Sequence, residues 1–191
     1  MGIICNFLIQ NCDGCDIILQ ETFKMNILVE QIRMTRKVIK DIIELDKDFY
    51  LDFDYSDTSW YFKRYNTNNK VTVLKVDGKI VGYYLFYTIS EKLLKDICEL
   101  KFSGDYDFDE QEVNVASDIE YIPSVLVKKE YLQFAYRLLL QLKKDIINKK
   151  RLVAIAISSE GKRMCEKFMI NVGSIEKKNV NIYILNRTCK P

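Results

Sequence analysis

Residues 122–140 read IPSVLVKKEYLQFAYRLLL, and this stretch decides the fold. Apolar residues on both sides of Pro123 indicate a β-strand that the proline interrupts, because proline has no N–H for regular pairing. A long amphipathic helix is predicted next, over about Glu130 to Asn148. Its apolar positions recur at helical spacing: Tyr131, Ala135, Leu138, Leu139, Leu142 and Ile146. The stretch therefore predicts a splayed strand that leads into a helix.

Strand and helix patterns alternate on both sides of this stretch. The clearest is a hairpin, 71–76 and 79–89, around the turn dipeptide Asp77-Gly78. The other predicted elements are a strand over 27–32, helices over 36–48, 57–65 and 91–100, a strand over 117–127, a strand over 152–157, a helix from Ser158 or Ser159 to Phe168, and a strand or hairpin over 174–185. This order predicts a mixed α/β (α+β) fold with a central mixed sheet and helices on both faces.

The first residues form a separate pattern. Apolar runs at 3–10 and 16–23 flank Asp13-Gly14, which predicts an additional N-terminal hairpin. We therefore expect an extension over 1–24 and a main domain over 25–191, in one globular unit.

Composition excludes several classes of function. The chain of 191 residues has no histidine, so a histidine base, a Ser-His-Asp triad and a histidine-ligated zinc are ruled out. Its 29 basic and 27 acidic residues leave a net charge of +2, which gives no electrostatic case for a nucleic-acid partner. No apolar run is long enough for a membrane span, and we expect no membrane partner and a cytoplasmic location. Cys12 and Cys15 have no second pair of ligands, so no metal site is expected.

Three strings resemble the GNAT superfamily of acetyl-CoA-dependent N-acetyltransferases. They are 71–89, with VDGKIVGYYLFY, 122–140, quoted above, and 153–170, VAIAISSEGKRMCEKFMI. The resemblance covers residues 26–185 and implies acetyl-CoA as the acyl donor. In the family, the second string is a strand, a phosphate-binding turn and a helix, and the third is a strand and a helix.

The resemblance assigns the CoA contacts to the second string. Backbone groups of Val125 and Val127, around Leu126, would bind pantetheine, and the N–H groups of about Leu132 to Arg137 would bind the pyrophosphate. The family's two glycines are missing from this turn, which reads Leu132, Gln133, Phe134, Ala135, Tyr136 and Arg137. Lys128, Lys129 and Arg137 are candidate compensating cations. The alternative is that they are ordinary surface charges.

The resemblance also suggests catalytic positions. Cys165 stands where the family often has an acidic tyrosine, and Ser158 stands at the position of an asparagine. A buried structural cysteine is the alternative for Cys165. Glu120 is the candidate base, with Tyr121 beside it as a second ionisable group. Glu120 could instead be a solvent-facing residue.

These residues favour an acyl-CoA-dependent N-acyltransferase that moves an acetyl or similar group to an amine. The alternative is a pseudoenzyme of the same fold, acting as a CoA-binding sensor or an interaction module, in which the N-terminal hairpin pairs with a second copy to form a homodimer. The sequence does not identify the amine. Acidic residues between Gly104 and Glu112 would suit a cationic amine, or would simply be solvated.

Overall fold

A computed structural model describes residues 25–50, 54–65, 69–101, 108–175 and 180–186. The N-terminal hairpin expected over 1–24 lies outside the described residues. No helix in the described ranges is both long and apolar enough to span a membrane.

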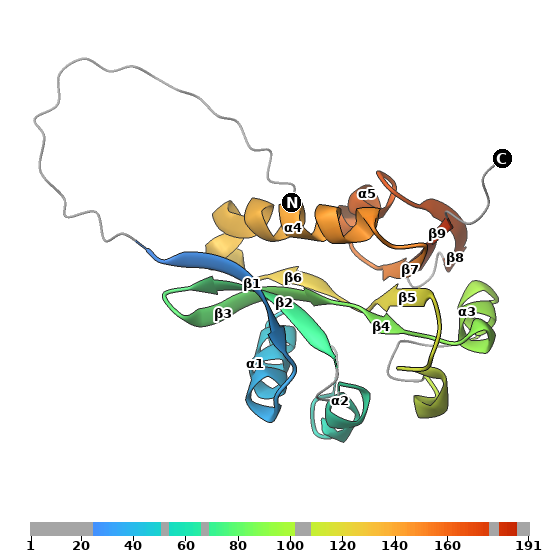
Figure 1. Ribbon diagram of the computed structural model, residues 1–191, viewed down its shortest axis with the longest axis horizontal. Coiled ribbons are helices and arrows are strands. Elements are labelled where there is room, and N and C mark those ends of the chain that lie inside the picture. The colour runs from blue at the N-terminus through green and yellow to red at the C-terminus, as the bar shows by residue number, and fades with distance from the viewer. Residues whose placement is uncertain (1–24, 51–53, 66–68, 102–107, 176–179, 187–191) are drawn as a thin grey trace, which may run out of the picture.

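The described strands form two sheets (Figure 1). The first has the order β1-β2-β3-β6 and is antiparallel, and the second has the order β4-β5-β7-β9-β8 and is mixed. The strands are β1 (Ile27–Arg33), β2 (Lys70–Val76), β3 (Lys79–Leu85), β4 (Tyr87–Thr88), β5 (Ile119–Ile122), β6 (Val125–Val127), β7 (Arg151–Ala156), β8 (Ile170–Ile175) and β9 (Val180–Asn186). The predicted mixed α/β architecture is confirmed.

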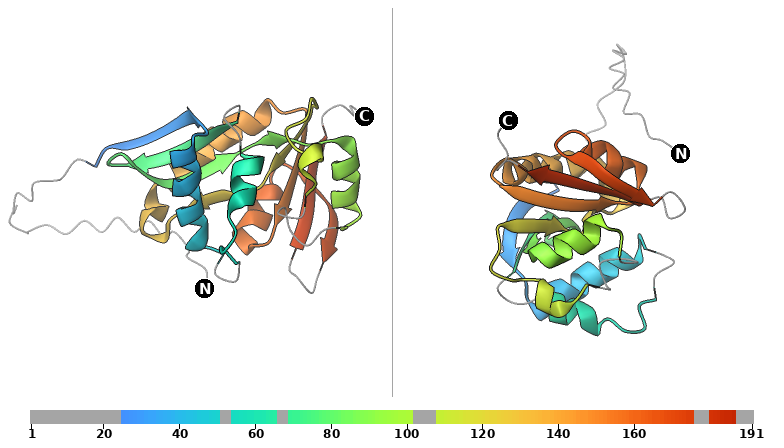
Figure 2. Two further views of the ribbon diagram at one scale, coloured as in Figure 1. Left: turned by 90° about the horizontal axis from the view of Figure 1, so that it is seen from below. Right: turned by 90° about the vertical axis from the view of Figure 1, so that its right-hand side faces the viewer.

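Helices cover both faces of these sheets, as Figures 1 and 2 show. One face carries α1 (Arg36–Lys47) and α2 (Ser59–Arg64), and the other carries α4 (Ala135–Ile147) and α5 (Ser159–Cys165). Each face has its own apolar core. We call them the α1-side core, which includes Ile42, Tyr83 and Leu126, and the α4-side core, which includes Leu74, Val127 and Leu138.

The hairpin between β2 and β3 forms at the predicted turn. Asp77 and Gly78 both have positive φ, 49° and 80°, as a tight type I′ connection requires. The Asp77 carboxylate also accepts a hydrogen bond from the Asn26 N–H at 2.9 Å. This contact fixes the start of β1 beside the turn.

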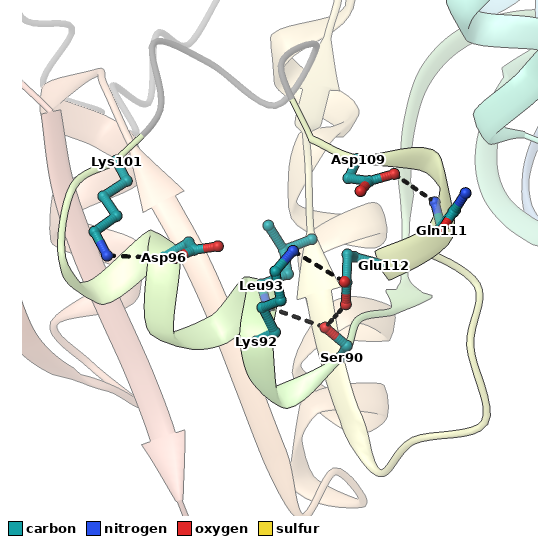
Figure 3. Close-up of polar contacts among 8 residues, drawn as sticks. All are labelled: Ser90, Lys92, Leu93, Asp96, Lys101, Asp109, Gln111 and Glu112. Atoms are coloured by element: carbon teal, nitrogen blue, oxygen red, sulfur yellow. Dashed lines mark hydrogen bonds and ion pairs between the residues drawn. The ribbon is translucent and has the colours of Figure 1, made fainter.

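Figure 3 shows how the acidic residues before β5 are used. They belong partly to a short 3-10 helix, η2 (Glu110–Glu112). The Ser90 Oγ caps α3 (Glu91–Cys98) by accepting from the Leu93 N–H at 3.0 Å, and Glu112 contacts both Ser90 and Lys92. Glu110 pairs with Lys63 at 3.2 Å. Both glutamates are therefore engaged in contacts within the protein.

The largest differences from the sequence-based expectation lie at three element boundaries. The helix predicted from Glu130 begins at Ala135, because residues Lys129–Phe134 form a 3-10 helix, η3, whose N-cap residue Lys128 provides no side-chain cap. The helix capped by Ser158 ends at Cys165 rather than Phe168. The last element is a hairpin that begins at Ile170.

Gly82 permits the close approach of β3 and β6, so a larger residue at this position should lower the stability of the protein. A Cβ at this position would lie 2.7 Å from the Leu126 carbonyl oxygen and 2.8 Å from the Val127 Cγ2. We expect Gly82→Ala to destabilise the protein by about 1–3 kcal/mol, since a backbone atom must move. Gly173→Ala is the matched control, because its nearest neighbours lie at 3.9 Å. Equal melting temperatures for the two variants would contradict this account.

Candidate functional site

The central feature is an opening in the sheet between β6 and β7. Strand β5 pairs in parallel with β7 as far as Ile122 opposite Ala154. After Pro123 the chain continues as β6, which pairs with β3 and not with β7. The proline that interrupts the predicted strand therefore marks the point where the two sheets separate.

The backbone of β6 presents polar groups to this opening. The Lys128 N–H donates to the Val81 carbonyl on β3 at 2.8 Å. Backbone N–H groups alternate in direction along a strand. The N–H groups of Val127 and Val125 therefore point away from β3, toward the opening. An extended amide-containing ligand can pair with such an edge as an added strand would.

The break also changes which residues face each core. Before it, Tyr121 faces the α1-side core and Ile122 the α4-side core; after it, Leu126 faces the α1-side core and Val127 the α4-side core. A regular strand would keep residues of one parity on one face, so the break inserts one residue. Ser124 lies at this step, and its Oγ is 3.0 Å from the Tyr50 hydroxyl.

A buried aspartate at the end of α1 contacts two tyrosines from neighbouring elements. Asp46, at the end of α1, is 4% exposed, and its carboxylate accepts hydrogen bonds from the Tyr61 hydroxyl at 2.7 Å and the Tyr83 hydroxyl at 2.6 Å. Tyr83 lies on β3 opposite Leu126 of β6. The cluster therefore fixes α1, α2 and β3 to one another, and β3 in turn pairs with β6.

The same cluster predicts a loss of stability in alkali. Burial, and then the Asp46 charge, raise the pKa of both Tyr61 and Tyr83 above the ordinary value. The folded state thus holds these protons more tightly than the unfolded state, so this stabilisation is complete below about pH 10 and is lost above it. Urea unfolding at about pH 8 and about pH 11 should show a lower midpoint at the higher pH. An unchanged midpoint would contradict the assignment.

The expected pyrophosphate turn is occupied by η3 and the first turn of α4. The Tyr131 N–H donates to the Lys128 carbonyl at 2.9 Å, and the Ala135 N–H donates to the Leu132 carbonyl. These amides are therefore used within the turn. The other residues assigned to this turn, Gln133, Phe134 and Tyr136, lie on it as half-buried or exposed side chains.

The three candidate cations lie around this turn. Lys128 pairs with Asp48 at 2.8 Å. Lys128 and Lys129 line a cleft of about 670 Å³ beside the end of α1. Arg137 reaches the other way, and its Nη1 donates to the Ile27 carbonyl at 3.2 Å. The cations thus surround the turn without converging on one point.

Glu120 lies on β5 and faces α4. Its carboxylate pairs with the Lys149 Nζ at 2.6 Å, and the same Nζ lies 4.5 Å from the centre of the Phe86 ring. Both charged groups line a polar cleft of about 370 Å³, together with Gln31, Asn69, Lys70, Phe86, Tyr87, Thr88 and Asn114. Glu120 is thus a partly buried carboxylate at an open polar surface.

The structure does not bring the other two predicted catalytic side chains to Glu120. Tyr121 faces the opposite side of the sheet, where its ring packs against Tyr87 and Phe108. Cys165 is buried in the α4-side core, and burial, followed by the Glu166 charge, raises the pKa of its thiol to about 11. A raised pKa makes the thiol a weaker proton donor at neutral pH.

Ser158 lies across the opening from β6. It follows β7 and caps α5, its Oγ accepting from the Gly161 N–H at 3.0 Å. Its hydroxyl retains a proton to donate. Among the residues that the structure describes, no group of three or more acidic or cysteine side chains could hold a metal ion.

Sequence reasoning missed Tyr50, Ser124 and Asp46. Ser124 directly follows Pro123, and its position at the predicted break is the feature of the sequence that could have pointed to it. Asp46 carries no such signal, since its partner Tyr83 lies 37 residues away.

Comparisons with known proteins bear on the fold. No protein-family model and no curated protein matches the chain. Solved structures do match. One is an acetyltransferase of the GNAT family from Staphylococcus aureus, which is 11% identical over 84% of this chain and 99% of that one, with a TM-score of 0.53. Another is the ribosomal-protein-S18-alanine N-acetyltransferase from Escherichia coli, which is 9% identical over 82% of this chain and 91% of that one, with a TM-score of 0.51.

A third match is longer than this chain. It is the N-acetylglutamate synthase from Neisseria gonorrhoeae, solved with coenzyme A and L-arginine. The match covers 83% of this chain but only 33% of the synthase, with 14% identity and a TM-score of 0.48. The Staphylococcus aureus and Escherichia coli structures, in contrast, are matched over 99% and 91% of their own length, with TM-scores above 0.5. The chain has the fold of the GNAT acetyltransferases.

Proposed function

We propose that this protein is an acyl-CoA-dependent N-acyltransferase that transfers an acetyl or similar acyl group to an amine. The observation that carries the proposal is the open edge of β6, where the Val125 and Val127 N–H groups face the gap beside β7. The amide-rich pantetheine arm of acyl-CoA is a ligand of the right chemistry for this edge. Lys128, Lys129, Arg137 and Ser158 are the proposed contacts of its anionic part.

The proposed reaction is a single acyl transfer. The amine nitrogen attacks the thioester carbonyl, a C–N bond forms, the C–S bond breaks, and CoA leaves as a thiol after gaining a proton. An N–H on the β6 edge near Val127 would stabilise the negative charge that develops on the carbonyl oxygen. Glu120 would accept the proton of the amine directly or through water. Much of the rate would come from holding amine and thioester in position.

Tyr121 and Cys165 remain in the proposal only as secondary candidates. Cys165 would have to donate its proton to the leaving thiolate, which its raised pKa and its burial disfavour. Tyr121 faces the α1-side core, so it would act on that side of the sheet.

The role of Glu120 gives a prediction with a matched control. Glu120→Gln keeps the shape of the side chain and removes the base, so kcat should fall by about 10²-fold or more while the KM for acetyl-CoA changes little. Glu30→Gln is the control, because Glu30 also pairs with a lysine, Lys75, at 2.6 Å on a strand of the other sheet. Equal kcat values for the two variants would remove Glu120 from the mechanism.

A second candidate function rests on the turn. The Tyr131 and Ala135 N–H groups are hydrogen-bonded within the turn, and the predicted catalytic side chains lie in three different surroundings. The separation of the catalytic side chains favours a pseudoenzyme of this fold that binds CoA as a sensor, and the two observations together favour one that serves as an interaction module.

One assay separates these functions. The purified full chain is mixed with acetyl-CoA and a panel of amines, including peptides with free N-termini, lysine and polyamines, and free thiol is followed with a thiol reagent. An amine-dependent release of CoA supports the transferase. Binding of acetyl-CoA without release over the whole panel would overturn transfer and leave the sensor.

A further inference from the structure

The outer face of α4 carries an apolar stripe. Tyr136, Leu139 and Leu140 lie three and four residues apart on α4, so they share one side of that helix, and Leu132 on η3 precedes them. They are between 42% and 55% exposed, whereas Leu138 and Leu142 of the same helix are buried in the α4-side core. Exposed apolar side chains that gather in this way mark an interaction site more often than singly scattered ones do.

The chain enters the described structure beside this stripe. The Arg137 Nη1 donates to the Ile27 carbonyl at the start of β1, and the Arg137 Nε donates to the Tyr136 hydroxyl at 3.2 Å. Ile27 itself packs against the α4-side core. Met25, two residues before Ile27, is 48% exposed. Residue 25, the first that the structure describes, is therefore two residues away in sequence from a carbonyl that contacts the side chain of Arg137.

Residues 1–24 are complementary to the outer face of α4 in polarity and charge, and they are long enough to cover the apolar stripe. Residues 3–9 and 17–19 are mostly large and apolar, and 1–24 contain Asp13, Asp16 and Glu21 against one lysine, Lys24. The outer part of α4 carries Arg137, Lys143 and Lys144. An extended run of eight residues covers about 26 Å, more than the roughly 12 Å from Leu132 to Leu140.

We infer that residues 1–24 pack over the outer face of α4 in the same molecule. The short tether gives the segment an effective concentration in the millimolar range, which favours this intramolecular contact over a second copy of the chain. The segment would remove the four exposed side chains from water and would place its acidic residues near Arg137, Lys143 and Lys144. This arrangement is independent of the proposed transferase activity.

Disulfide trapping in the full chain tests the inference. Leu140→Cys places a thiol on the stripe, and the segment supplies Cys5, Cys12 and Cys15. Mild oxidation should join residue 140 to one of these cysteines within one chain, at least about 10-fold faster than in Lys40→Cys. Lys40 is an exposed position on α1, on the opposite face of the sheet. Peptide mapping identifies the pair, and non-reducing electrophoresis gives the number of chains.

A charge variant provides a second readout. Leu140→Asp should speed the hydrogen exchange of amides in residues 17–23 by about 5-fold or more, and Lys40→Asp should leave it unchanged. Equal trapping rates for the two cysteine variants would overturn the inference. Trapping only between two chains would overturn it in favour of a dimer. Fast exchange of residues 17–23 in the unmodified protein would also overturn it.

Discussion

Replacing Asp46 by alanine is expected to lower the free energy of unfolding by about 3–5 kcal/mol, a large fraction of the stability of a domain of this size. The change removes a buried carboxylate that accepts hydrogen bonds from the Tyr61 and Tyr83 hydroxyls, at 2.7 and 2.6 Å. Each is a hydrogen bond to a charged group, and each hydroxyl would be left buried without that acceptor. Urea unfolding followed by circular dichroism measures the change.

The control lies on the same helix. Glu44 is exposed and pairs with Lys47 at 2.7 Å, so Glu44→Ala should change stability by about 0.5 kcal/mol or less. Asp46→Asn, which keeps an acceptor oxygen but not the charge, should fall between the two. If Asp46→Ala unfolds at the same urea concentration as Glu44→Ala, the cluster does not fix α1 to the sheet.

The second large effect concerns acyl-CoA binding at the open edge. Val127→Pro removes the one backbone N–H of that residue, which points toward the opening and not toward β3. The β3–β6 ladder keeps its hydrogen bonds, such as Lys128 N–H to Val81 at 2.8 Å, because edge positions tolerate proline when the missing N–H faces outward. We expect acetyl-CoA to bind at least about 10-fold more weakly, as measured by isothermal titration calorimetry.

Val127→Ala separates the backbone from the side chain. It keeps the N–H and removes only methyl groups from the α4-side core, so acetyl-CoA affinity should stay near that of the unmodified protein. Thermal unfolding without ligand shows that both variants are folded. Equal losses of affinity in Val127→Ala and Val127→Pro would show that the edge N–H is not the contact.

Much of the fold could be predicted because its signals are local. Asp77-Gly78 fixes the β2–β3 hairpin through two positive φ angles, and Thr35 caps α1 by accepting from the Val38 N–H. Pro123 marks the break between β5 and β6. The start of α4 was predicted too early, since helical periodicity alone does not distinguish a 3-10 turn from an α-helix when no residue caps the first turn.

The site was less predictable because its contacts are not local. Glu120 and Tyr121 are neighbours in sequence, yet adjacent strand residues face opposite sides, so they cannot share one small site. Glu120 instead meets Lys149 from the end of α4. The contacts of Asp46 with Tyr83 and of Tyr50 with Ser124 join segments 37 and 74 residues apart. No periodic pattern in the sequence encodes such pairs.

Titration of acetyl-CoA into the full chain by isothermal titration calorimetry tests the central claim most directly, because every proposed role of the opening requires this ligand. We expect saturable binding of one molecule per chain, competed by CoA and weakened in Val127→Pro. No heat of binding and no thermal stabilisation at about millimolar acetyl-CoA would contradict it.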